Sequence, residues 1–416
     1  MKVGLRKLAM PLAVVSMAFL FAGFGVRVLA SCSGFGLPFT DLGSETTFCA
    51  AIAEAYFSGL TNGTSATTYD PTGNVPRDQM AAFITRTLDQ SLLRGSPRAA
   101  LDQWWTQTPH YDKASLGLTS VGDIPILLKS DGADVWVANR NGGTVSRVRG
   151  SDGTKLEDWT GATSACGVLI ALGRVFVTGD IPPNGMNQPQ PGKLYMIDPA
   201  APAGPVIPVT SALASFPCGI AFDGSKIWTA SSGGGGQPSG VSIVTPGTWS
   251  VATVTTGFSE LSGIIFDGSH IWVADFGAAK LFKLDANGAI LQTVTVGTEP
   301  ANPAFDGHNL WVPNWGADSL TVVRASDGTV LKTFSAANGN QNGLSRPNQA
   351  AFDGQRILVS DSNVFGFSLF KAADLSVIGN VATPGIQPFG VCSDGISFWV
   401  TFPNTASPGT GKVGRF

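Results

Sequence analysis

Charged residues are scarce in this chain of 416 residues, where Asp, Glu, Lys and Arg together make up 13%. The 26 basic and 29 acidic residues nearly cancel, so no net field would steer the protein to nucleic acid or to an anionic membrane. The five cysteines form no Cys-x-x-Cys pair, which argues against a structural zinc site or a redox dithiol. Turn formers are abundant instead, with 52 glycines and 26 prolines, and this composition favours many short strands over helices.

The N-terminal segment has the pattern of an export signal. A short basic stretch precedes an apolar run over residues 8–26, and small residues follow at positions 28–30. We therefore expect residues 1–30 to be a signal peptide and the mature, exported protein to have no transmembrane span. The stretch 29–32 also resembles a bacterial lipobox, in which Cys32 would carry a lipid.

Residues 31–88 are expected to form a small helical module. Apolar residues recur at helical spacing in Ala50–Phe57 and again from about Arg77, and a segment with glycine and proline turn signals separates the two. In an exported protein Cys32 and Cys49, close in the sequence, are a candidate disulfide pair.

This module resembles an S-layer homology domain. The resemblance lies in four stretches, which read FTD (39–41), GLTNG (59–63), YDP (69–71) and VPRDQM (75–80). In that family the arginine of the last stretch helps to bind cell-wall polymer, so the resemblance implies an envelope polymer as a partner and Arg77 as its contact. Such modules usually act in sets of three and this chain shows one copy. A cap or spacer module with a solvated Arg77 is therefore the alternative.

After a mixed connector over residues 89–113, the remaining chain consists of repeats. The unit that begins FDGSHIWVADFG at Phe266 recurs at intervals of 39 to 52 residues. The first residue of its Asp-Gly pair, here called the aspartate position, is Asp131, Ala171, Asp223, Asp267, Asp306, Asp353 and Asp394 in the seven copies. Five residues after each of these positions stands a large apolar residue, namely Trp136, Phe176, Trp228, Trp272, Trp311, Leu358 and Trp399. The period is that of a four-stranded sheet and not of a helical solenoid.

Within one unit the turn signals separate four strands. In the unit around Asp306, strands are expected to end at the Asp-Gly pair, to cover Leu310–Pro313 and Ser319–Arg324, and to finish at Val330–Phe334. The Asp-Gly pair is interpreted as a two-residue hairpin turn, and the large residue five positions later as packing between neighbouring sheets. Residues 114–416 thus predict an all-β, seven-bladed β-propeller. The last unit lacks a fourth strand, which we expect Ala114–Val121 to supply.

The repeats resemble the broad YVTN/NHL class of β-propellers and, more loosely, the streptogramin-lyase-like propellers. The resemblance is specific for fold, and it is weak for function because this fold hosts many functions.

The columns expected at the channel carry no carboxylate and no histidine. Five positions before the aspartate position lie Ile126, Cys166, Cys218, Ser262, Ala301, Asn348 and Phe389. The next column holds Leu127, Gly167, Gly219, Gly263, Asn302, Gln349 and Gly390. Acid/base or metal chemistry needs titratable groups that converge on one point, so we assign no catalytic, cofactor or metal residue. Cys166 and Cys218 share a column in consecutive blades and are interpreted as two buried thiols.

The resemblance to the lyase-like enzymes implies a possible metal site, because those enzymes use histidines and a carboxylate near a bound metal. His270 and His308 are the candidate residues for such a site. His270 and His308 lie in the first turn of adjacent blades, where other blades place Lys226 and Arg356, and we interpret all four as solvated turn residues. The sequence thus favours a non-enzymatic, envelope-associated propeller that binds an unknown protein or glycan. The proline-rich stretch Ile181–Pro191 is a candidate contact loop. A lyase or hydrolase with a cleft on one face, and a structural surface protein without a ligand, are the alternatives.

Overall fold

The computed structural model describes residues 37–42, 52, 61, 63–75, 80, 117–180, 190–234, 236–335, 343–383, 385–403 and 411–416. The chain divides into two compact units, Met1–Thr108 and Pro109–Phe416. The expected signal peptide, the connector 89–113, Arg77 and the Cys32–Cys49 pair lie outside the described residues. In the ranges that the structure describes, no helix combines the length and apolar character needed to cross a bilayer.

In the first unit, two segments far apart in the sequence contact each other. The Asp41 carboxylate accepts hydrogen bonds from the backbone N–H groups of Tyr69 (2.9 Å) and Asp70 (2.7 Å), which lower its pKa. The Phe39 ring packs on Tyr69 at 5.5 Å between centroids, within a small apolar cluster that also holds Leu42 and Ile52. Residues 39–42 and 69–70 are thereby joined through a carboxylate and an aromatic pair.

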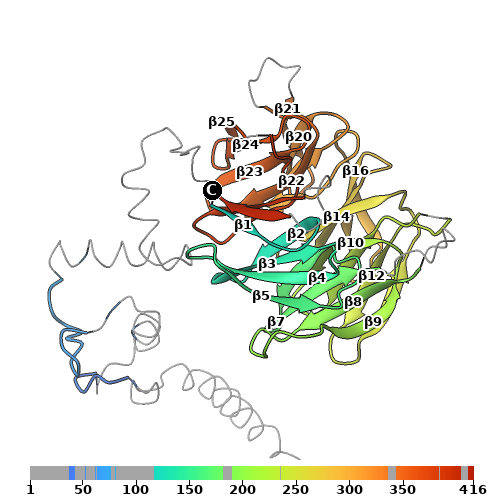
Figure 1. Cartoon of the computed structure of the whole chain (residues 1–416). Coiled ribbons are helices and arrows are strands. Elements are labelled where there is room, and N and C mark those ends of the chain that lie inside the picture. Colours follow the sequence, from blue (N-terminus) through green and yellow to red (C-terminus); the bar gives the residue numbers. More distant parts are fainter. Residues whose placement is uncertain are drawn as a thin grey trace, which may run out of the picture. The chain divides into compact units, whose positions relative to one another are not determined.

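The second unit consists of seven four-stranded antiparallel sheets (Figure 1). The first blade contains β2 (Pro125–Ser130), β3 (Asp134–Asn139), β4 (Thr144–Arg149) and β5 (Lys155–Thr160). The second contains β6 (Val168–Ala171), β7 (Arg174–Gly179), β8 (Gly192–Ile197) and β9 (Ile207–Leu213). The third contains β10 (Pro217–Phe222), β11 (Ile227–Ser231), β12 (Gly240–Thr245) and β13 (Ser250–Val254). The fourth contains β14 (Leu261–Phe266), β15 (Ile271–Asp275), β16 (Lys280–Leu284) and β17 (Ile290–Thr295).

The remaining blades complete the ring. The fifth contains β18 (Ala304–Phe305), β19 (Asn309–Asn314), β20 (Ser319–Arg324) and β21 (Val330–Ser335). The sixth contains β22 (Pro347–Phe352), β23 (Arg356–Asp361), β24 (Gly366–Lys371) and β25 (Ser376–Ala382). The seventh contains β26 (Val391–Ser393), β27 (Phe398–Phe402), β28 (Lys412–Arg415) and β1 (Gly117–Ser120). Each first strand contacts the first strand of the next blade, and β26 contacts β2, so the inner strands form a closed ring.

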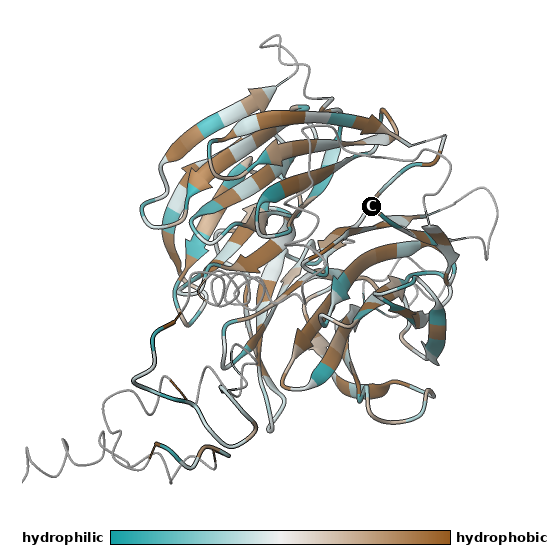
Figure 2. Ribbon diagram, turned by 90° about the vertical axis from the view of Figure 1, so that its left-hand side faces the viewer, coloured by the Kyte–Doolittle hydropathy of each residue, from teal (hydrophilic) through white to brown (hydrophobic). Residues whose placement is uncertain are grey.

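The predicted fold and the predicted closure are confirmed. Strand β1 pairs with β28 in the register Leu118↔Gly414, which places the start of the propeller beside its end. Apolar residues recur along the strands of the propeller (Figure 2), as expected for sheets that are packed on both faces. The large residues of the repeat lie between blades as predicted. Trp272, for example, is fully buried against Leu310 and Val312 of the following blade.

The Asp-Gly turn differs from its prediction, because four residues and not two lie between the paired ends of the first and second strands in six blades. In the second blade, which lacks the aspartate, Ala171 pairs with Arg174 and two residues connect the strands. Phe266 pairs with Ile271, and the Asp267 N–H donates to the His270 carbonyl at 3.0 Å. One oxygen of Asp267 accepts from the N–H groups of Ser269 and His270, and the other accepts from the Trp272 indole N–H at 2.7 Å. The turn is therefore held by the aspartate side chain and not by a primed two-residue geometry.

The same aspartate–tryptophan hydrogen bond recurs in five blades, at Asp131–Trp136, Asp223–Trp228, Asp267–Trp272, Asp306–Trp311 and Asp394–Trp399. It explains the fixed spacing of five residues, since a buried indole N–H needs an acceptor. The second blade has lost both partners, with Ala171 and Phe176 in their places. In the sixth blade Leu358 replaces the tryptophan, and Asp353 pairs with Arg356 instead, at 2.8 Å.

Candidate functional site at the channel mouth

The two ends of the sheets differ in what they present. At one end lie the aspartate turns between the first and second strands, which include His270 and His308. At the other end, here called the mouth face, lie the turns between second and third strands and the connections that lead into the next inner strand. The Arg140 N–H donates to the Ile124 carbonyl there at 2.9 Å, which joins one such turn to one such connection.

Apolar side chains pack together where the inner strands of the first blade and its neighbours begin, near the mouth face. Ile126, Leu127 and Cys166 form a buried cluster, against which Ile124 and Phe389 pack. No carboxylate or histidine belongs to this cluster. This part of the channel wall is thus apolar, whereas the same columns hold Ser262, Asn302, Asn348 and Gln349 in the fourth to sixth blades.

The prediction for the two channel cysteines is wrong, because Cys166 and Cys218 form a disulfide with a Cα–Cα distance of 5.0 Å. The reason is the neighbouring glycine. A Cβ atom on Gly167 would overlap the Cys218 carbonyl oxygen, and one on Gly219 would lie 2.9 Å from the Ser262 carbonyl oxygen. Glycine at this position lets the backbone of the next inner strand approach closely, so adjacent blades come within disulfide range.

Two positions in each blade define the rim of the mouth. The first lies seven residues before the aspartate position, in the connection to the inner strand, and it holds Ile124, Ser164, Phe216, Glu260, Glu299, Arg346 and Gln387. The second lies nine residues after the aspartate position, in the turn after the second strand, and it holds Arg140, Asp180, Ser232, Phe276, Trp315, Ser362 and Pro403.

Backbone hydrogen bonds join these two positions in five blades, with the N–H of the second donating to the carbonyl of the first. The pairs are Arg140–Ile124, Ser232–Phe216, Phe276–Glu260, Trp315–Glu299 and Ser362–Arg346, at 2.7 to 3.3 Å. At the first position five non-glycine residues adopt left-handed backbone angles, with φ between 49° and 57°; these are Ile124, Ser164, Phe216, Glu299 and Arg346. A left-handed conformation costs such residues on the order of 1 kcal/mol or more, and the repeated geometry of the connection maintains it.

Over the fourth, fifth and sixth blades, side chains at the two rim positions contact one another. The Arg346 guanidinium lies over the Trp315 ring at 4.6 Å, and the Phe276 ring lies 6.3 Å from that of Trp315. Through the backbone bonds described above, Glu260 lies beside Phe276 and Glu299 beside Trp315. Trp315 and Phe276 are half-buried, whereas Glu260 and Arg346 are exposed. We call these five residues the rim row.

The rim row combines two half-buried aromatic rings, two carboxylates and one guanidinium. The Arg346 backbone is held by the Asp318 carboxylate, which accepts from its N–H at 2.7 Å. Aromatic residues and arginine are enriched at the energetically important positions of protein interfaces. This part of the rim therefore has the composition of a recognition surface.

Sequence reasoning missed the rim because it considered only the columns five and four residues before the aspartate. His270 and His308 lie at the opposite end of the sheets, in the turns between β14 and β15 and between β18 and β19. Among the described residues, no group of three or more His, Cys, Asp and Glu side chains is placed to hold a metal ion. Variation between the units was the available signal, since six units keep the aspartate and five keep the tryptophan, whereas the residues at the two rim positions differ widely.

A buried polar position lies directly below the rim, eight residues after the aspartate. In the structure Asp275 is buried at the end of β15 and accepts from the backbone N–H groups of Ser259 (2.7 Å), Glu260 (3.1 Å) and Ala278 (2.9 Å). Asp275 thus fixes the connection that carries Glu260, which makes it a positioning residue for the rim.

Comparisons with known proteins agree on the fold and go no further. No protein-family model and no curated protein matches the chain. Among solved structures, a streptogramin B lyase matches with a TM-score of 0.53 and 14% sequence identity, over 72% of this chain and 97% of that one. A catalytically inactive histidine-to-alanine variant of virginiamycin B lyase from Staphylococcus aureus, solved with quinupristin, matches with a TM-score of 0.55 and 15% identity, over 71% and 98%. At this identity the likeness establishes a shared propeller fold.

Proposed function

We propose that this protein is a binding protein whose propeller recognises a protein ligand at the mouth face, with a glycan as the other ligand class. The observation that carries the proposal is the rim row of Glu260, Phe276, Glu299, Trp315 and Arg346, built on two positions that vary while the frame around them repeats. Export through residues 1–30 and attachment to envelope polymer through the module at 31–88 and Arg77 complete the proposal.

The experiment compares the intact mature protein with two variants in a capture assay. The double variant Trp315→Ala, Arg346→Ala removes the stacked pair at the rim, and His308→Ala changes an exposed turn at the other end of the sheets as the matched control. Each protein is immobilised and exposed to secreted and envelope proteins of the producing cell and, separately, to a panel of immobilised glycans. We expect a defined ligand that the wild type and the control retain and that the rim variant loses. Equal capture by all three proteins would overturn the assignment of the mouth face.

Attachment is tested separately by sedimentation with purified peptidoglycan that carries its secondary polymer. The proposal expects wild type to sediment and Arg77→Ala to remain in solution. If neither protein sediments, the anchoring role is withdrawn while the binding role of the propeller stands.

A lyase or hydrolase activity is the second candidate, favoured by the fold likeness to streptogramin B lyase. The carboxylates of Glu260 and Glu299 would be the available acid or base groups at the rim. Quinupristin incubated with the purified protein and followed by mass spectrometry tests this candidate directly. Conversion that Glu299→Gln abolishes would support it, whereas unchanged quinupristin would remove this substrate. A structural surface protein is the reading that remains if neither ligand nor substrate is found.

A further inference from the structure

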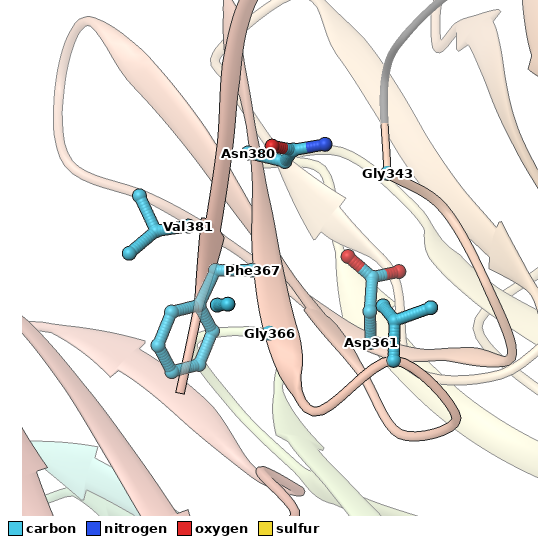
Figure 3. Close-up of a pocket in the computed structure, with 8 residues that line it drawn as sticks. Gly343, Asp361, Gly366, Phe367, Asn380 and Val381 are labelled. Atoms are coloured by element: carbon cyan, nitrogen blue, oxygen red, sulfur yellow. The ribbon is translucent and has the colours of Figure 1, made fainter. Parts of the chain in front are cut away.

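A cavity of about 160 Å³ lies at the mouth-face end of the sixth blade (Figure 3). Its lining residues are Gly343, Asp361, Val364, Gly366, Phe367, Asn380, Val381 and Ala382. None of them occupies either rim position, so the cavity is separate from the rim row. Figure 3 shows the Asp361 carboxylate pointing toward the space beside Gly343 and Asn380, with the Phe367 ring on the other side of its strand.

At the cavity, the sixth blade departs from the first and the fifth at two positions. In those blades an asparagine stands where the sixth has Asp361, and its amide donates to two hydroxyl groups on the next strand. Asn139 donates to Thr144 (3.0 Å) and Ser146 (2.9 Å), and Asn314 donates to Ser319 (3.0 Å) and Thr321 (2.9 Å). The sixth blade keeps the second hydroxyl as Ser368 but has Gly366 in place of the first. A Cβ atom on Gly366 would lie 2.7 Å from the Val381 carbonyl oxygen, so the glycine lets the neighbouring strand approach closely and leaves the Asp361 carboxylate without the first hydroxyl partner.

Asp361 is a buried carboxylate with few donors. It accepts from the Ser368 hydroxyl at 2.7 Å and from the Ser345 N–H at 3.2 Å, whereas the equivalent Asp275 accepts from three backbone N–H groups. Burial raises the pKa of Asp361 well above its ordinary value, and the negative charge of Asp318 adds to the effect. Among the described residues no lysine, arginine or histidine is paired with it. A buried carboxylate without a cation is complementary to a ligand that supplies one.

We propose that this cavity binds a primary ammonium group, with the Asp361 carboxylate as its anionic partner. An ammonium group brings three donors and no acceptor, and its hydrogen bonds to a carboxylate are charge-assisted. Divalent metal ions fit less well, because Ca²⁺ requires six to eight oxygen ligands and the cavity offers one carboxylate. The space accommodates a short alkylamine or the end of a lysine side chain, since an engineered cavity of about 150 Å³ holds benzene.

The experiment measures binding to the full mature chain by calorimetry, with n-butylammonium as the probe and n-butanol as its neutral counterpart. Asp361→Asn is the test variant, and it places in the sixth blade the residue that the first and fifth blades use. Asp374→Asn removes an exposed carboxylate of the same blade and is the control for net charge. We expect saturable binding of n-butylammonium to the wild type and to the control, at least about tenfold weaker binding to Asp361→Asn, and no binding of n-butanol.

The source of the ammonium group is distinguished by a second probe, Nα-acetyl-lysine methylamide. Binding of both amines extends the site to lysine side chains of a protein, and binding of n-butylammonium alone restricts it to free amines. The proposal is overturned if the wild type shows no saturable ammonium binding, if Asp361→Asn binds as tightly as the wild type, or if Ca²⁺ occupies the site and n-butylammonium does not displace it. Circular dichroism of both variants establishes that each is folded. The result does not depend on the rim row, so its failure leaves the proposed function untouched.

Discussion

Replacement of Asp267 by alanine should destabilise the propeller mainly through a single tryptophan. Trp272 is fully buried, and its indole N–H donates to Asp267 at 2.7 Å. A hydrogen bond to a charged acceptor contributes about 1.5–3 kcal/mol, and a buried donor without a partner costs a similar amount. The same substitution also removes the acceptor for two turn N–H groups, which water can replace in part. We therefore expect Asp267→Ala to lower the free energy of unfolding by about 3 kcal/mol.

A double-mutant cycle separates the two contributions. In a Trp272→Phe background there is no indole N–H to leave unpaired, so Asp267→Ala should cost only the turn, about 1 kcal/mol. The second blade already carries this combination in natural form, with Ala171 and Phe176. Urea unfolding followed by circular dichroism measures all four proteins. If the aspartate substitution costs the same with tryptophan and with phenylalanine at position 272, the hydrogen bond is not the reason for the spacing of five residues.

Three further predictions concern the buried groups of the propeller. Cys166→Ser, Cys218→Ser should lower the free energy of unfolding by about 2–4 kcal/mol, because the disulfide closes a long loop, and reductant should then no longer affect the melting temperature of this variant. Burial raises the pKa of the Cys392 thiol to about 12. Cys392 should therefore resist iodoacetamide in the folded protein and react fully in guanidinium chloride. Fast labelling of the native state would contradict its burial. Asp361→Asn should stabilise the protein by about 1–2 kcal/mol at neutral pH. The pKa of Asp361 is raised in the folded state, so the contribution of its carboxyl group to folding stability is fully present below the unfolded pKa near 3.8. This contribution is lost as the pH rises through the folded pKa. The urea midpoints of wild type and variant should therefore converge toward pH 4.

The fold was predictable because its signals are local and repeated. The turn aspartate and the tryptophan five residues later lie in one hairpin, so their spacing survives in the sequence of every blade that keeps the pair. The closing strand at Gly117–Ser120 was predictable by counting, since the last unit is one strand short. The turn length was not, because Asp-Gly is compatible with both a two-residue primed turn and the four-residue turn observed at Asp267.

The Cys166–Cys218 disulfide and the rim could not be predicted, because both depend on distances between segments that the repeat pattern does not specify. Whether two cysteines of adjacent blades bond is set by how closely the inner strands approach, and that in turn is set by the absence of a side chain at Gly167. Likewise, Trp315 and Glu299 are sixteen residues apart in the chain and become neighbours only when the turn N–H meets the connecting carbonyl.

Seven copies of one unit also provide an internal comparison of what each position does. Ile124, Phe216, Glu299 and Arg346 share both the turn-to-connection hydrogen bond and the left-handed backbone, so the scaffold does not require glutamate at 299 any more than it requires isoleucine at 124. The differences between blades at these positions are thus left for a ligand to select. The same comparison applies to the buried position eight residues after the aspartate. Two blades have an asparagine with two hydroxyl partners there, and the sixth has an aspartate with one hydroxyl partner beside the cavity. The frame therefore contributes stability through the agreement of its copies, and the chemistry of this protein is to be sought where Glu299, Trp315, Arg346 and Asp361 depart from it.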